Sequence, residues 1–169
     1  MDNFFKTPVP IETSVTISRT GIVADVVSTL NKMAESRFDG QNTSYVNNLQ
    51  PEMDFDQDKN LVNGYFDEAV ANVMRRIEPY VTGYETNEGN TAGTLSLRFP
   101  ENWKAEMKPV LESKVNGYVK HYIIFQWLEK VSMPDVEYTA VKVSQLLRDV
   151  KGTCELRKGK VHRVWNGTY

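Results

Sequence analysis

The chain has 169 residues, of which 40% are hydrophobic and 25% are charged, and its formal net charge is −2. This length and composition predict one domain with a single core. The near-neutral charge argues against a protein that coats duplex DNA, because non-specific phosphate binding requires a cationic excess. The lone Cys154 excludes an intramolecular disulfide and any multi-cysteine metal site, and we expect it to be a buried reduced thiol.

The first twenty residues predict an extended arm. They include Pro8 and Pro10, and Val15 and Ile17 alternate with polar residues as in a β-strand. Arms of this kind serve as edge strands or partner contacts. The segment has no apolar core of the signal-peptide type, and no run in the chain approaches the roughly 20 apolar residues of a membrane span, so we expect a soluble protein made without export.

Two amphipathic helices are predicted next. Thr20 is a candidate N-cap for a helix over about 21–36, which carries an apolar stripe at three- and four-residue spacing. Residues 37–53 are polar and predict a loop. A second helix is expected from about 56–58 to 77, because its apolar residues keep the helical period and Pro79 follows it.

The central part of the chain predicts a hairpin and a long helix. Segments 80–84 and 94–99 are rich in β-forming residues and flank a polar stretch, which predicts a β-hairpin at about 80–99. A helix is then predicted over 100–131, with Trp103 on the apolar stripe of its first half. Its second half, 118–128, is apolar almost all round and must be buried on most faces.

The C-terminal part predicts a last helix and a tail. Ser132 and Asp135 are candidates for a capping box, and the inward positions of the helix are expected to be Val136, Ala140, Val143, Leu147 and Val150. The predicted fold class is mainly α: a helical bundle around one long central helix, with a β-hairpin and extended N- and C-terminal arms. We predict an extended arm over 1–20, a helical domain over 21–156 and a basic extended tail over 157–169.

The tail is the predicted partner interface. Its four basic residues carry enough charge that the net charge of −2 would become −6 without them. Most charge-biased tails are only solvated, but the apolar and aromatic residues near this end favour contact with a partner surface. The predicted interface residues are Arg157, Lys158, Lys160, Arg163, Val164, Trp165 and Tyr169. Truncation after Leu156 is expected to leave the fold intact.

One acidic cluster resembles the start of a calcium loop. Asp54, Asp56 and Asp58 have the spacing of the first three ligands. However, Lys59 stands where the sharp turn requires Gly, and Tyr65 stands where a bidentate Glu should close the shell. We therefore interpret the three carboxylates as residues at a helix N-terminus, where they interact favourably with the helix dipole.

Other candidate chemistry also favours a structural interpretation. His121 lies in the most apolar stretch and is expected to be buried and hydrogen-bonded, whereas His162 lies in the basic tail. The aromatic residues of the central helix are expected to pack in the core, because a base-stacking platform needs exposed rings among basic residues; they are Tyr118, Tyr122, Phe125 and Trp127. We predict no enzymatic activity, no cofactor and no metal.

Part of the chain resembles the head–tail connector (adaptor) proteins of tailed bacteriophages. The likeness covers about 54–128 and lies in the pattern Asp56-x-Asp58-x-x-Leu61, followed by Glu68-Ala69 and Val73, a β segment and Pro100 opening a helix. In that family an acidic pair caps a helix that has an Ala on its inner face. The chain departs from the pattern in its N-terminal 50 residues, its long polar hairpin and its added last helix.

The resemblance implies a non-enzymatic subunit of a homo-oligomeric ring. The helical bodies would pack side by side, and arms or a tail would reach the portal or tail proteins of a virion assembled in the host cytoplasm. Membrane contact is not expected, and DNA contact would be secondary. Two alternatives stay open: a DNA-packaging or nucleic-acid accessory protein that uses the basic tail, and a small enzyme with an unrecognised carboxylate site.

Overall fold

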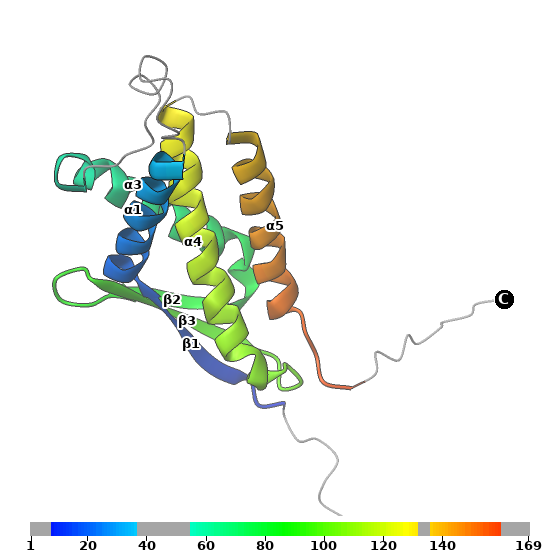
Figure 1. Cartoon of the computed structure of the whole chain (residues 1–169). Coiled ribbons are helices and arrows are strands. Elements are labelled where there is room, and N and C mark those ends of the chain that lie inside the picture. Colours follow the sequence, from blue (N-terminus) through cyan, green and yellow to red (C-terminus); the bar gives the residue numbers. More distant parts are fainter. Residues whose placement is uncertain (1–7, 37–54, 132–135, 160–169) are drawn as a thin grey trace, which may run out of the picture.

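The computed structural model describes residues 8–36, 55–131 and 136–159. Two short 3-10 turns, Glu78–Tyr80 and Ala105–Met107, accompany the main elements (Figure 1). In chain order these are β1 (Ile11–Ser18), α1 (Arg19–Ser36), α3 (Phe55–Arg76), β2 (Val81–Thr86), β3 (Ala92–Phe99), α4 (Lys108–Lys130) and α5 (Val136–Cys154). The described chain is therefore mostly helical, with a three-stranded antiparallel sheet in the order β1-β3-β2.

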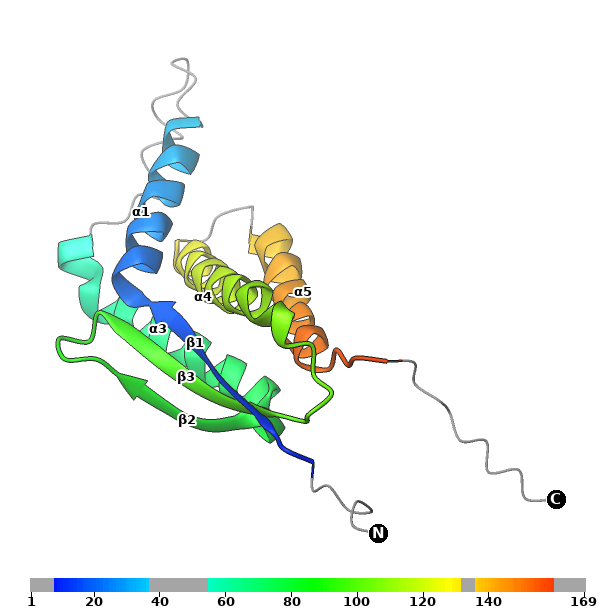
Figure 2. The same cartoon turned by 90° about the horizontal axis from the view of Figure 1, so that it is seen from below.

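The sheet has one apolar and one polar face. Alternate side chains on β1 and β3 are buried, as the two-residue period of a strand requires; they include Val15, Ile17, Leu95, Leu97 and Phe99. On the other face, Arg98 Nη2 lies 2.7 Å from Glu12 Oε1 across the β1–β3 pair. The helices cover the apolar face, as Figure 2 shows from below.

The sheet corrects the prediction of an extended arm over residues 1–20. Residues 11–18 pair with β3 along their whole length, from Ile11 opposite Phe99 to Ser18 opposite Ala92. Val15 and Ile17 are fully buried. The segment is an edge strand, which is one of the two roles predicted for the arm, but it belongs to the core of the domain. Removing it would expose apolar surface on β3 and α4.

Helix α4 lies at the centre, with α1 on one side, α5 on the other and α3 crossing behind it (Figure 1). No residue from Tyr118 to Leu128 is exposed, so the prediction that this stretch is buried is confirmed. Phe125 is only half-buried, whereas Trp127 is 4% exposed. Among the described helices, none is both long and apolar enough to cross a membrane.

The expected start of the central helix at Pro100 is wrong. Residues after Pro100 form a turn and a 3-10 segment, and α4 begins at Lys108, with Pro109 in its first turn where a missing N–H is tolerated. Trp103 is fully buried, but it is not part of a helix. Its ring stacks on Phe99 at 4.1 Å between centroids, and its Nε1 donates a hydrogen bond to the Thr153 carbonyl.

Several other boundaries shift. Helix α1 begins at Arg19, and Ser18 rather than Thr20 caps it, because Ser18 Oγ accepts a hydrogen bond from the Gly21 N–H. Helix α3 matches its prediction closely. In α5, Val143 and Val150 are buried as expected, while Val136, Ala140 and Leu147 are half-buried. The 37–53 loop and the capping box of Ser132 and Asp135 lie outside the described residues.

Candidate functional site

The C-terminal end of the described chain is held by the domain. The Arg157 guanidinium donates hydrogen bonds to the carbonyls of Cys154 (2.8 Å) and Leu156 (3.1 Å) and to the Tyr80 hydroxyl (3.1 Å). The backbone of Arg157 also forms a β-bridge with Trp103. Arg157 is half-buried, so it acts as a clasp between the end of α5 and the segment before α4.

Lys158 extends this clasp. Its N–H donates to the Asn102 carbonyl at 2.6 Å, and its ammonium lies 3.6 Å from Glu106 Oε2. These contacts correct the predicted boundary after Leu156, because the folded part continues through Arg157 and Lys158. The remaining predicted interface residues lie outside the described part of the chain, and their contact with a partner stays a prediction; they are Lys160, Arg163, Val164, Trp165 and Tyr169.

A groove of about 700 Å³ lies between α1, α3 and the β2–β3 turn. We call it the α1–α3 groove. Its wall on α1 is an apolar strip, in which Val23, Ala24 and Val27 recur at helical spacing on one face. The rest of the lining is polar residues of α1 and α3 and the turn residues 89–91; the helix residues are Arg19, Thr20, Ser28, Lys59 and Asn63. The groove therefore combines an apolar surface with amide and ammonium donors at its edges.

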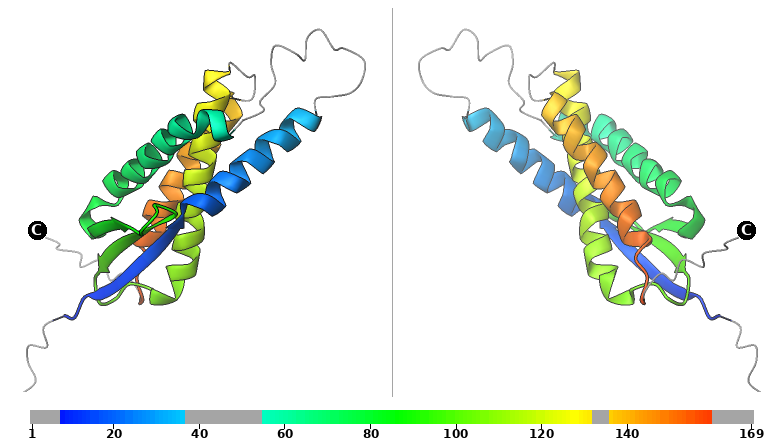
Figure 3. Two further views of the ribbon diagram at one scale, coloured as in Figure 1. Left: turned by 90° about the vertical axis from the view of Figure 1, so that its left-hand side faces the viewer. Right: turned by 90° about the vertical axis from the view of Figure 1, so that its right-hand side faces the viewer.

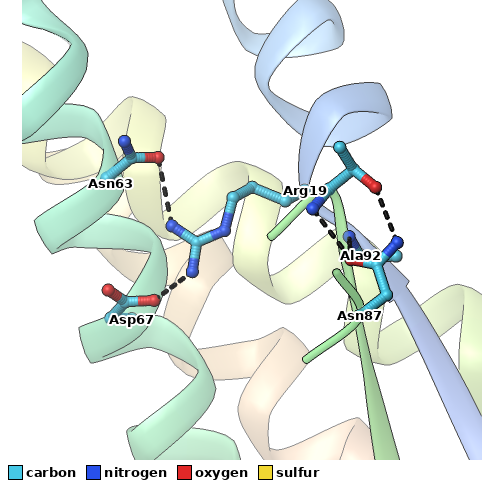
Figure 4. Close-up of polar contacts among 6 residues, drawn as sticks. Arg19, Asn63, Asp67, Asn87 and Ala92 are labelled. Atoms are coloured by element: carbon cyan, nitrogen blue, oxygen red, sulfur yellow. Dashed lines mark hydrogen bonds and ion pairs between the residues drawn. The ribbon is translucent and has the colours of Figure 1, made fainter. Parts of the chain in front are cut away.

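Arg19 lines the α1–α3 groove, and its side chain reaches from α1 to Asn63 and Asp67 of α3 (Figure 4). It is only 7% exposed, and its guanidinium donates to Asn63 Oδ1 at 3.0 Å and pairs with the Asp67 carboxylate. The guanidinium also lies 4.2 Å from the centre of the Phe66 ring. Because Asp67 is largely exposed, water weakens the ion pair, and the hydrogen bonds and ring contact supply the rest of the stabilisation.

The β2–β3 turn is held in place by Asn87. Its side-chain Oδ1 accepts hydrogen bonds from the N–H groups of Thr91 and Ala92, both at 2.9 Å. The Thr20 N–H donates to the Thr91 carbonyl, which ties the turn to the start of α1. Gly89 and Asn90 have positive φ values of 84° and 54°, a backbone conformation that Gly and Asn adopt most readily. The rim of the groove is thus preorganised.

The outward face of α5 carries two exposed apolar residues. Tyr138 is 75% exposed and Val141, one turn further on, is 70% exposed. They lie on the opposite side of the helix from Val143 and Val150, which are buried against the domain. Figure 1 shows α1 and α5 on opposite sides of α4, whereas Figure 3 shows α1 and α3 on opposite sides, with α4 and α5 between them. We call the exposed surface around Tyr138 and Val141 the α5 face.

The acidic cluster predicted at the start of the second helix is only partly described. Asp58 lies 3.4 Å from Lys130 Nζ of α4, so its carboxylate has a structural partner. Asp54 and the side chain of Asp56 lie outside the described part. Within the described ranges, no three His, Cys, Asp or Glu side chains come together as a metal site would require.

His121 and Cys154 each have a pKa shifted by burial. The Nδ1–H of His121 donates to the Gly117 carbonyl at 2.8 Å, and burial lowers the pKa of the imidazole. Burial raises the pKa of the Cys154 thiol to about 12, so the nucleophilic thiolate is scarce at neutral pH. Cys154 is fully buried, as the sequence predicts. His121 makes the expected hydrogen bond but is only half-buried, which corrects the prediction of a buried histidine.

Sequence reasoning missed the α1–α3 groove and the α5 face. The groove forms only where α1, α3 and the β2–β3 turn lie together. The sequence of each of these segments gives no indication that it contacts the others. Tyr138 and Val141 left a weaker signal, because they lie off the inward stripe predicted for the last helix. Comparisons with protein-family models, with curated proteins and with solved structures found no match to this chain.

Proposed function

We propose that this protein is a structural virion protein: a head–tail connector, or adaptor, subunit that forms a homo-oligomeric ring between portal and tail. The observation that carries the proposal is the α5 face, where the apolar side chains of Tyr138 and Val141 are both mostly exposed to water. Exposed aromatic and branched apolar residues that lie side by side are typical of protein interfaces. An assembly subunit needs such a surface.

Features of the resembling segment also support the proposal. Ala69 and Val73, the inner-face positions of the family pattern, are fully buried in α3. The segment at Pro100 departs from the pattern, because α4 begins eight residues later, at Lys108. The predicted tail anchors, among them Trp165, would in this proposal reach the portal or a tail protein rather than a neighbour in the ring.

The alternative of a nucleic-acid accessory protein has less support. It relied on four tail cations, but Arg157 donates its hydrogen bonds within the domain and Lys158 lies beside Glu106. Fewer cations are therefore available for phosphates than the sequence suggested. The alternative of a small enzyme relied on an unrecognised carboxylate site, and the α1–α3 groove offers mainly apolar and amide groups instead.

The proposal is tested by measuring the mass of the purified protein over a wide concentration range and imaging it by electron microscopy. We expect closed rings at high concentration and binding to purified portal particles. A protein that stays monomeric at every concentration would contradict the ring. DNA binding that weakens steeply with salt, in the absence of rings, would favour the nucleic-acid alternative.

A further inference from the structure

Resting on the ring proposal, we infer that the α5 face of one copy docks into the α1–α3 groove of the next copy. Tyr138 and Val141 would enter the groove and contact its apolar strip at Val23, Ala24 and Val27. The occupant is thus a second copy of this chain. This assigns both halves of one interface to described residues.

The placement of the two surfaces favours this arrangement. Figure 1 shows α1, which supplies the apolar strip of the groove, and α5 on opposite sides of α4. An interface between two different surfaces of identical subunits is heterologous, and its repetition gives a ring where the rotation closes. If α5 packed on a second α5, the contact would be isologous and would stop at a dimer.

The chemistry of the two surfaces is complementary. The groove pairs an apolar strip with donor groups from Lys59 and Asn63 at its edge. The α5 face pairs apolar side chains with a tyrosine hydroxyl, and the exposed Glu137 lies one helical turn before Val141. A tyrosine buries its ring while its hydroxyl still needs a polar partner, which the groove edge provides. Glu137 would likewise face Lys59 across the contact.

The groove is also built to bind without rearrangement. Arg19 joins α1 to α3, and Asn87 holds the turn that forms the rim. A surface that is already ordered loses little conformational entropy when it binds, so a modest apolar contact can contribute useful affinity. Anchoring by an aromatic residue in such a groove is the usual form of an interface hot spot.

The experiment uses two complementary single variants of the full chain. Val141→Arg places a charge on the α5 face and leaves the groove intact, whereas Ala24→Arg fills the groove and leaves the α5 face intact. Both positions are exposed, so both variants should fold, as circular dichroism would check. Thr94→Arg, which adds the same charge on the polar face of the sheet, is the matched control.

We expect each variant alone to need at least about tenfold more protein to assemble than the wild type or the control. An equimolar mixture of the two retains one good interface per pair. It should therefore give a heterodimer of twice the 19.3 kDa chain mass, and no ring. Assembly of Ala24→Arg at the wild-type concentration would overturn the inference, and so would failure of the mixture to pair.

A cross-linking measurement separates this inference from the ring proposal. Copies carrying Lys142→Cys, an exposed position one turn after Tyr138, are mixed with copies carrying Ser28→Cys, an exposed position that lines the groove. The mixture is treated with a short bismaleimide. The native Cys154 is fully buried, so wild-type protein is the unreactive control. Rings without this cross-link would overturn the inference alone. A cross-linked pair without rings would support the contact and overturn the closed ring, and loss of both would overturn both.

Discussion

Truncation after Leu156 should destabilise the protein, whereas truncation after Gly159 should not. The shorter protein loses three hydrogen bonds from the Arg157 guanidinium and the bond from the Lys158 N–H to Asn102. Each bond contributes about 0.5–1.5 kcal/mol net, and Arg157 is half-exposed, so we expect a total loss of about 2–4 kcal/mol. The longer protein keeps all of these contacts.

The assay is thermal and urea unfolding of the two truncated proteins beside the full chain. For a protein of this size each kcal/mol lowers Tm by about 2–4 °C, so the cut after Leu156 should lower Tm by roughly 5–15 °C. Arg157→Ala in the full chain should account for most of that loss, because it removes the three side-chain bonds. Arg157→Lys should recover little, since one ammonium cannot reach the same acceptors as a planar guanidinium.

Equal Tm values for the two truncated proteins would refute the assignment of Arg157 as a clasp. The same pair of proteins also separates stability from assembly. The cut after Gly159 removes Trp165 and the other predicted tail anchors without touching the described contacts. If the tail binds the portal or a tail protein, this truncated protein should fold normally and form rings but fail to join the larger particle.

Three further predictions follow from packing and titration. Gly93→Ala should cost about 1–3 kcal/mol by overpacking, because its new Cβ would clash with the Tyr84 hydroxyl. Tyr84→Ala in the same protein should relieve most of that cost, and an additive double-mutant cycle would contradict the clash. Trp127→Ala should destabilise by about 3–5 kcal/mol and Phe125→Ala by clearly less, because Phe125 is only half-buried; equal urea midpoints would contradict this order. Burial raises the pKa of the Cys154 thiol from 9.0 to about 12, so the unfolded state loses the thiol proton first and the free energy of unfolding should fall as pH rises from 9 towards 12. Cys154→Ala should reduce this pH dependence in unfolding experiments. An unchanged pH dependence would assign it to other groups.

The sequence by itself determined the elements whose signals are local. The stripe of α3 and the apolar second half of α4 repeat within a few turns, so their helical state and burial were readable before any packing was known. The hairpin was readable for the same reason, since its strands and turn are neighbours in the chain. The burial of Cys154 was predicted from its immediate surroundings in the same way, whereas His121, expected to be buried on the same basis, is only half-buried.

Only the tertiary structure decided which distant segments meet. The pairing of Ile11 with Phe99 joins residues far apart in sequence, and no feature of either segment predicts that the two strands pair. Trp103 fits a helical stripe by spacing, yet its ring is buried by stacking on Phe99 and by a bond to Thr153. Periodicity reports that a side chain is buried, but not which element buries it.

The same limit explains the candidate interface. The sequence predicts that Arg157 is an exposed cation of the tail, because charged side chains are usually exposed. In the structure it donates hydrogen bonds to the Cys154 carbonyl at the end of α5 and to the Tyr80 hydroxyl. The α1–α3 groove exists because Arg19 and a capped turn hold α1, α3 and the hairpin together. A hollow between elements is a property of their relative placement, and that placement is fixed by long-range contacts that leave no periodic trace in the sequence.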